Sequence, residues 1–173
     1  MARRRVPNFC FEYVEGGSED EATLRRNREV FSNIAFQPRT LVDVTVRNQR
    51  RRLLGEEIAS PFLIGPTGFS GLLSSEGDVS MARAAASAGI PFVLSNVSTT
   101  SLEDVVRRAG ADARVWMQVY MYRTREFVEK IARRAQDAGI GTLVLTTDSA
   151  IYGKREWDVR NFSGPLMWCL KNR

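Results

Sequence analysis

The sequence contains no histidine among its 173 residues. Imidazole is the side chain that most often exchanges protons near neutral pH, so a mechanism that needs one must obtain it from outside this chain. The two cysteines, Cys10 and Cys169, lie near opposite ends and match neither a metal-ligand spacing nor a disulfide framework. No apolar run is long enough to cross a bilayer as a helix. We therefore expect a reduced, cytoplasmic chain without a metal site.

The composition is that of an ordinary globular protein with a basic surface. Hydrophobic residues make up 43% and charged residues 26%, with a formal net charge of +5 and a pI of about 9.7. That charge suits an anionic ligand, nucleic acid or an acidic membrane surface, and it equally suits a basic surface with no partner. Because no binding motif and no interleaving of aromatic and basic residues supports nucleic acid, we do not expect it as a partner.

The first 60 residues are expected to form an appendage to the main fold. Ser18 and Glu21 have the spacing of a capping box, which predicts a helix from Ser18 to about Ile34. Two strands should follow: Leu41–Val46 alternates between apolar and polar residues, and Arg51–Ile58 turns around Gly55.

Residues 61–173 read as four strand–helix units. Apolar strands that recur after helices of this length indicate parallel strands. Glycines are expected just past each helix end, and serines at two of the helix starts. The expected strands are Phe62–Gly65, Phe92–Ser95, Val115–Tyr120 and Thr142–Thr147; the helices are Glu76–Ala88, Leu102–Ala109 and Arg125–Ala138; the capping residues are Ser75, Ser101, Gly89, Gly110 and Gly139.

Parallel strands form either an open, doubly wound sheet or a closed barrel. The doubly wound fold usually carries G-x-G-x-x-G after its first strand, and the segment Gly65–Gly71 does not match that pattern. A barrel needs eight strand–helix units, of which four are present. We therefore predict the amino-terminal half of a TIM (β/α)8 barrel.

Polar residues cluster at the expected carboxyl ends of the strands, the edge at which α/β folds bind ligands. Residues two apart on a strand share a face, which pairs Gln118 with Tyr120. The run Gly141–Asp148, which we read as a strand buried on both faces, ends in hydroxyls and a carboxylate. Each of these residues also has an ordinary reading as a turn, a packed residue or a cap. The candidates are Pro66, Thr67, Gly68, Ser95, Gln118, Tyr120, Thr146 and Asp148.

Several motifs together resemble the FMN-dependent 2-hydroxy acid dehydrogenases and oxidases, which include glycolate oxidases, flavin lactate dehydrogenases and mandelate dehydrogenases. The mandelate dehydrogenases look most similar. The likeness covers nearly the whole chain, and its motifs are Phe11–Glu21, Phe36–Arg39, Leu41–Val44, Ile64–Gly68, Gln118–Tyr120 and Leu145–Asp148.

The resemblance implies FMN at the carboxyl-end mouth of a TIM barrel. The backbone of Pro66, Thr67 and Gly68 would lie along the flavin ring, and Ser95, Gln118 and Thr146 would bond its polar edge. Tyr13, Tyr120 and Arg155 would bind a small 2-hydroxy acid, and Asp148 would pair with a catalytic histidine. Such an enzyme oxidises the acid to a 2-keto acid.

That histidine belongs to the second half of the family's barrel, so the resemblance implies a missing carboxyl-terminal half as a partner and, when complete, a homo-oligomer. The likeness decays after Asn161. Trp168 and Leu170 beside Lys171 suit a peripheral contact with the inner face of a membrane, and they equally suit an ordinary loop. A non-catalytic half-barrel that self-associates through open sheet edges is the alternative function.

Overall fold

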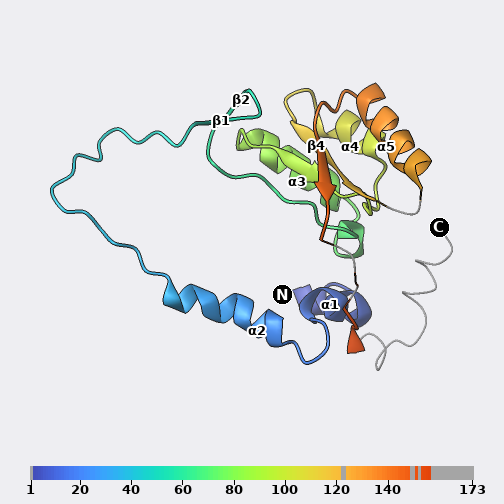
Figure 1. The fold of residues 1–173 in the computed structure, drawn as a ribbon, viewed down its shortest axis with the longest axis horizontal. Helices are drawn as coiled ribbons and strands as arrows, with labels where there is room; N and C mark the ends of the chain where they lie inside the picture. Colours follow the sequence, from blue (N-terminus) through green and yellow to red (C-terminus); the bar gives the residue numbers. More distant parts are fainter. Residues whose placement is uncertain (1, 122–123, 149–150, 152, 157–173) are drawn as a thin grey trace. The chain divides into compact units, whose positions relative to one another are not determined.

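The computed structural model describes residues 2–121, 124–148, 151 and 153–156. The chain forms two compact units. The amino-terminal unit comprises residues up to Thr45 together with the described residues from Ile151 to Glu156, and the sheet unit begins at Val46 and includes the described residues up to Asp148. The two units differ in content, since every strand among the described residues belongs to the sheet unit (Figure 1).

The amino-terminal unit is helical. A short 3-10 helix, Ala2–Arg4, precedes helix α1, Asn8–Glu15. Pro7 is the residue before the first turn of α1, and Gly16 follows its last residue. A proline fits this position because the first amides of a helix need no partner within it. Helix α2, Ala22–Glu29, continues into a 3-10 turn, Val30–Asn33.

The predicted helix from Ser18 begins later than expected, and the capping box does not form. Glu19 and Glu21 both have positive φ, and the backbone N–H of Glu21 donates to the Ser18 carbonyl at 3.0 Å. The Glu21 carboxylate accepts a bond from Gly17 N–H at 2.9 Å, outside the helix. A left-handed Glu21 cannot continue a right-handed helix, so α2 starts at Ala22.

The predicted strand Leu41–Val46 is wrong, and the predicted second strand, Arg51–Ile58, is instead a hairpin of two short strands that turns at Gly55. Asp43 Oδ1 accepts a bond from Thr45 N–H at 2.9 Å, which makes a local turn in place of a strand. Strands β1, Arg51–Leu53, and β2, Glu56–Ile58, pair antiparallel around Leu54 and Gly55. Both turn residues have positive φ, as a tight two-residue hairpin requires.

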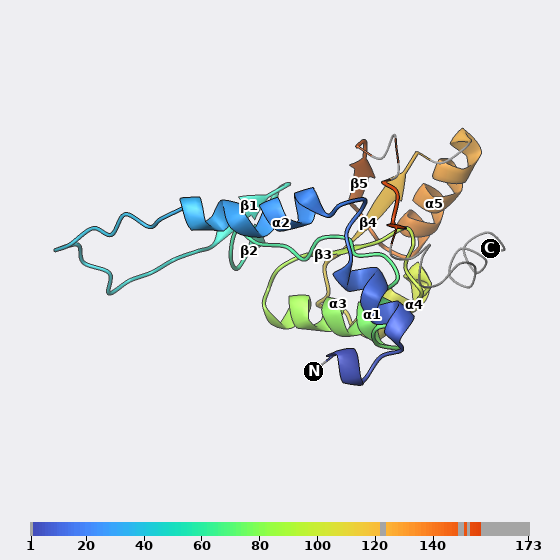
Figure 2. The same ribbon diagram turned by 90° about the horizontal axis from the view of Figure 1, so that it is seen from below.

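A three-stranded parallel sheet forms the centre of the sheet unit (Figure 2). Its strands lie in chain order: β3, Phe92–Leu94; β4, Val115–Tyr120; and β5, Leu143–Thr146. The predicted first strand is reduced to one parallel bridge between Ile64 and Phe92. Neighbours along the sheet therefore follow the sequence, as in a barrel wall, and the order does not reverse as it does in doubly wound folds.

Helices follow the strands as the sequence predicts. Helix α3 spans Gly77–Ser87, α4 spans Leu102–Ala109 and α5 spans Arg125–Asp137, and a 3-10 turn covers Ser70–Leu72. The Ser101 cap of α4 is confirmed, since its hydroxyl accepts a bond from Asp104 N–H at 3.2 Å. The predicted Ser75 cap is wrong, because Glu76 is the capping position and makes no side-chain cap. The three glycines past the helix ends, Gly89, Gly110 and Gly139, have positive φ.

The core lies between one face of the sheet and the three helices. Strand residues two apart point to it, namely Phe92 with Leu94, and Val115 with Met117 and Val119. Helix residues that are almost fully buried pack against them, including Val79, Val105 and Ala135. The alternate strand residues, among them Gln118, therefore face the opposite side of the sheet.

Strand β5 is not buried on both faces as predicted. Leu143 and Leu145 remain 48% and 54% exposed. They pair in register with Met117 and Val119, so they lie on the helix-covered face of the sheet. Their exposure follows from position: β5 is the edge strand among the described residues, and α3, α4 and α5 pack beside β3 and β4.

A bidentate ion pair between Glu103 and Arg134 links α4 to α5. Glu103→Gln is expected to lower the free energy of unfolding by about 0.5 kcal/mol at neutral pH. Arg134 Nε and Nη2 each donate to a Glu103 oxygen at 2.8 Å, and this bonding lowers the pKa of Glu103 below its ordinary 4.5. Because the pKa of Glu103 is lower in the folded chain than in the unfolded chain, its charge stabilises the fold at pH values above 4.5. This stabilisation is lost as the pH falls through the lowered pKa of the folded state.

Urea unfolding of both proteins from pH 7 down to pH 3 checks this pH dependence. The difference between Glu103→Gln and the parent chain should shrink below about pH 4.5. Glu15→Gln is the control, because its 3.9 Å contact with Arg28 is long and exposed. A difference that is constant with pH would contradict a role for the charge of Glu103.

Candidate functional site

The amide of Gln118 connects the carboxyl ends of all three strands. Its Nε2 donates to Oγ1 of Thr146, the last residue of β5, at 2.8 Å. Its Oε1 accepts a bond from the backbone N–H of Asn96, two residues after β3, at 2.9 Å. Gln118 itself is 1% exposed and lies on the sheet face opposite the helices. A buried amide with a partner at each end is held in a single orientation.

Ser95 and Gly68 form the adjoining corner. The Ser95 hydroxyl, which is buried, accepts a bond from Val97 N–H at 3.2 Å. A Cβ placed on Gly68 would lie 3.7 Å from Ser95 Oγ and only 2.5 Å from Val97 Cγ2. The backbone at Gly68 therefore approaches the loop after β3 so closely that a side chain there would overlap Val97 unless Val97 shifted.

The neighbouring backbone is open to ligands. Pro66 and Thr67 are exposed, and a Cβ on Gly65 would meet nothing within 4 Å. The structure thus brings Gly68, Ser95, Gln118 and Thr146 together at one edge of the sheet, with Pro66 and Thr67 in the adjacent segment. This is the arrangement expected from the strand ends.

Gly68→Ala is expected to lower the free energy of unfolding by about 2 kcal/mol, because its methyl group would overlap Val97. Valine is stiff about χ1 and cannot turn its methyl group away freely. The double variant Gly68→Ala/Val97→Ala should recover most of the loss, since the remaining Cβ contact of 3.8 Å is ordinary.

Urea unfolding of the single and double variants measures this coupling, and Gly65→Ala is the matched control with open space around its Cβ. The control should change the free energy of unfolding by less than about 0.5 kcal/mol. Additive losses at Gly68 and Val97 would contradict a steric conflict between the two positions.

Tyr120 and Asp148 both come at the carboxyl ends of strands in the sheet, as the residues of the polar cluster do. Tyr120 is half-buried, shares the face of Gln118 and pairs in register with Thr146. Asp148 follows β5 by two residues and is exposed. Its exposed carboxylate is accessible to a group from outside the sheet unit.

Tyr13 and Arg155 contact each other within the amino-terminal unit. The Arg155 guanidinium lies over the Tyr13 ring with Cζ 4.4 Å from its centroid, which is a cation–π contact. Its Nη2 donates to the carbonyl oxygens of Tyr13 and Gly16, the latter at 3.1 Å. Arg155 therefore also closes the carboxyl end of α1, a structural task that its place in a Lys-Arg-Glu run did not indicate.

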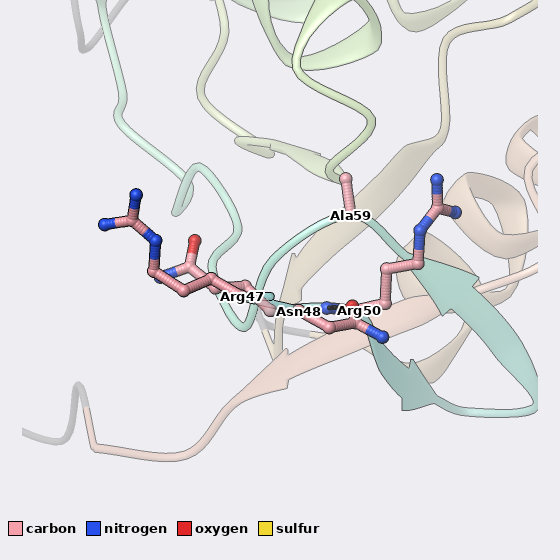
Figure 3. A pocket seen from close by; sticks show the side chains of 5 residues that line it. Arg47, Asn48, Arg50 and Ala59 are labelled. Carbon is pink, nitrogen blue, oxygen red and sulfur yellow. Dashed lines mark hydrogen bonds between the residues drawn. The ribbon is translucent and has the colours of Figure 1, made fainter. Parts of the chain in front are cut away.

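A shallow hollow of about 490 Å³ lies near the hairpin, away from the strand ends, and none of the candidate residues lines it. Its lining residues are Arg47, Asn48, Gln49, Arg50 and Ala59. Figure 3 shows the side chains of Arg47 and Arg50 pointing in opposite directions. Arg50 is paired with Glu57 at 2.7 Å. We take the strand-end cluster as the site, because its polar groups converge and those of the hollow do not.

Four polar residues are buried in the described part of the chain, and the sequence singled out two of them. Ser95 and Gln118 were candidates; Ser70 and Asp78 were not. Asp78 looks in sequence like an ordinary acidic residue in the first turn of a helix, and only the tertiary structure shows that it is buried. In the same described part, no group of acidic residues and cysteines could hold a metal ion.

The donor set suits a flat, polar heterocycle. An amide and two hydroxyls lie beside an exposed glycine-containing backbone, which a planar ring can approach closely. Parallel strands in chain order, helices on one face and a polar strand-end edge together define an α/β fragment of the barrel class.

Comparison with known proteins identifies the family. Residues 2–172 match the FMN-dependent dehydrogenases. (S)-mandelate dehydrogenase of Pseudomonas putida is 43% identical over 172 residues, which are 99% of this chain and 43% of that protein. Glycolate oxidase 1 of Zea mays is 39% identical over 173 residues, or 99% of this chain and 46% of that protein. This chain belongs to the FMN-dependent dehydrogenase family, as its motifs indicated.

Solved structures agree with the sequence comparison. The structure of a monotopic membrane protein, (S)-mandelate dehydrogenase, matches with a TM-score of 0.87 at 43% identity, covering 96% of this chain and 44% of that one. A mandelate oxidase variant solved with an FMN adduct matches with a TM-score of 0.85 at 34% identity, covering 95% and 49%. The fragment therefore matches TIM-barrel FMN dehydrogenases over about half their length.

The chain spans 39% to 47% of the length of the curated relatives with which it aligns. Among the residues that the structure describes, no helix is both long and apolar enough to cross a membrane. Residues 157–173, where the sequence offered Trp168 and Leu170 for membrane contact, lie outside the described part of the chain.

Proposed function

We propose that this chain supplies the flavin-binding half of an enzyme that oxidises a 2-hydroxy acid to the 2-keto acid with FMN. The observation that carries the proposal is the Gln118 amide, which links Asn96 N–H to Thr146 Oγ1 at the strand ends. A structural glutamine would need no exposed glycine backbone beside it. Here Gly65, Pro66 and Thr67 leave that side open.

The proposed flavin contacts come from this edge. The backbone of Pro66, Thr67 and Gly68 would hold the flavin ring, and Ser95, Gln118 and Thr146 would hydrogen-bond its polar edge. When bound, FMN accepts the two electrons that leave the substrate. The chain's own part is to orient the ring and to keep water from the buried side of the amide network.

Substrate binding is assigned to Tyr13, Tyr120 and Arg155, with the hydroxyls and the guanidinium holding the substrate carboxylate or hydroxyl. Asp148 is assigned as the partner of the catalytic histidine, which acts as the base. Asp148 would orient this histidine and stabilise its protonated form. With no histidine in the sequence, that base comes from the carboxyl-terminal half of the barrel. The base takes one proton from the substrate.

The substrate class is a small 2-hydroxy acid that resembles lactate, glycolate or mandelate, and the similarity to enzymes named for these three acids supports this class. We further propose a cytoplasmic enzyme that forms a homo-oligomer with its second half in place. A peripheral contact with the inner face of a membrane is supported by the relative described as monotopic and by the net charge of +5.

Purification of the full polypeptide that carries this chain tests the proposal. The protein should be yellow, and anaerobic addition of (S)-mandelate, L-lactate or glycolate should bleach the flavin absorbance with release of the keto acid. A correctly folded but colourless protein that takes up no added FMN would contradict the proposal. Bleaching by one acid only would identify the substrate.

A second candidate is a non-catalytic half-barrel that self-associates. The exposed Leu143 and Leu145 on the edge strand β5 favour it, because an unpaired edge with apolar side chains promotes association. Colourless oligomers that Leu145→Lys dissociates would support this candidate. Monomeric, flavin-loaded protein would exclude it.

A further inference from the structure

Asp78 is a buried carboxylate in the second position of α3. It is 1% exposed, although an acidic residue in the first turn of a helix usually remains in water. Its Oδ2 accepts a bond from Ser98 Oγ at 2.7 Å. Its Oδ1 and the hydroxyl of Ser70 are the buried side-chain oxygens without a hydrogen-bond partner in the described part of the chain. An apolar side chain here would be less costly, so the carboxylate contributes through the geometry that it imposes.

Ser98 passes this constraint to the loop after β3. Its hydroxyl accepts a bond from Thr100 N–H at 3.0 Å, and its own N–H donates to the Ser95 carbonyl at 3.1 Å. Ser95 Oγ in turn accepts from Val97 N–H. The Ser98 hydroxyl also has the Thr100 carbonyl oxygen within 2.8 Å, and its bond to Asp78 ties α3 to the turn that presents Ser95 and the Asn96 N–H.

The same loop holds the segment that carries Gly68. Phe69 N–H donates to the Val97 carbonyl at 3.1 Å, and Gly71 N–H donates to Thr99 Oγ1 at 3.0 Å. These two bonds hold residues 69–71 against the loop that contains Ser98. On the other side, a Cβ on Gly77 would lie 3.0 Å from Ser70 Oγ, so the start of α3 packs directly against this segment.

We propose that Asp78 is a positioning residue, which through Ser98 sets the relative placement of the Gly68 backbone and the Ser95–Asn96 corner. This inference rests on the proposed function, because the edge so positioned is the one assigned to the flavin. Asp78 itself touches neither FMN nor substrate. Its carboxylate accepts the Ser98 hydroxyl and thereby joins α3 to both loops.

Amide hydrogen exchange and FMN titration of the full polypeptide test the inference with three variants. Asp78→Ala removes the acceptor, Asp78→Asn keeps an acceptor oxygen, and Asp112→Ala is a control in an exposed loop. In Asp78→Ala, the amides of Phe69, Gly71 and Thr100 should exchange about tenfold faster, and the FMN dissociation constant should rise about tenfold. In Asp78→Asn, the exchange rates and the FMN dissociation constant should both be close to those of the wild type. In Asp112→Ala, neither quantity should change.

A lower melting temperature with unchanged loop exchange and unchanged FMN affinity would overturn the inference, since Asp78 would then be only a core residue. If Asp78→Ala does not fold, Ser98→Ala removes the same bond. Because that variant also removes the acceptor of the Thr100 N–H, the amides of Phe69 and Gly71 are then the ones that should exchange about tenfold faster. Wild-type protein without FMN affinity would refute the proposed function, while the exchange data would still decide whether Asp78 fixes the two loops.

Discussion

Gln118→Leu is expected to raise the FMN dissociation constant of the complete enzyme at least about a hundredfold. Leucine keeps the buried volume but removes the acceptor of Asn96 N–H and the donor to Thr146 Oγ1. Two half-buried polar groups at the strand ends then lose their partner, and each such loss costs about 1–3 kcal/mol when the group is shielded from water. The proposed bond from Gln118 to the ring edge is lost as well.

Fluorescence titration of FMN against the variants measures this effect. The FMN dissociation constant of Gln118→Glu should lie between those of Gln118→Leu and the wild type. The ionised carboxylate still accepts a bond from the Asn96 N–H, but it cannot donate one to Thr146. Gln136→Leu is the matched control, since that glutamine lies exposed on α5. Unchanged FMN affinity in Gln118→Leu, with the fold intact, would show that the amide serves the sheet alone.

Asp148→Asn is expected to lower the turnover number of the complete enzyme about a thousandfold or more and to leave its FMN content unchanged. Asparagine has nearly the same shape but cannot stabilise a protonated imidazole, and loss of this support in comparable histidine sites costs about 10⁴ in turnover. The exposed position of Asp148 after β5 means that the substitution disturbs no buried contact.

Steady-state turnover and flavin content, measured on the same preparations, separate the two roles open to Asp148. Asp112→Asn is the control for the loss of one exposed negative charge. A parallel loss of FMN and turnover would make Asp148 a structural residue. Turnover close to wild type would remove it from the catalytic assignment.

Much of the fold could be predicted because local signals and burial agreed. Helix α4 begins and ends where expected, since Ser101 caps its first turn and Gly110 follows its last residue. β4 was equally clear, because all but the last of its residues are buried and apolar or amide-bearing. The errors fell where a local pattern lacked a partner. Leu41–Val46 alternates like a strand, yet its Asp43–Thr45 turn competes and no other strand pairs with it in the described part of the chain.

For the candidate site, the sequence likewise indicated the residues but not the contacts between them. The residues at the strand ends were visible in the sequence, since polar groups that close apolar runs indicate the ligand edge of a parallel sheet. Their bonding was not visible. No spacing rule connects Gln118 to Asn96 and Thr146, which lie 22 and 28 residues away. Arg155 likewise appeared as a ligand for substrate, and its contact with Tyr13 emerges only from the folded chain.

By itself, the sequence determined the order of strands and helices, the edge at which polar residues gather, the family and the lack of an imidazole. Each of these follows from residue type and local spacing. The tertiary structure decided which of those polar residues meet, why a side chain at Gly68 would overlap Val97, and that Asp78 is buried. These features depend on contacts between segments distant in the chain, and their geometry is fixed only when the strands pair and the helices pack.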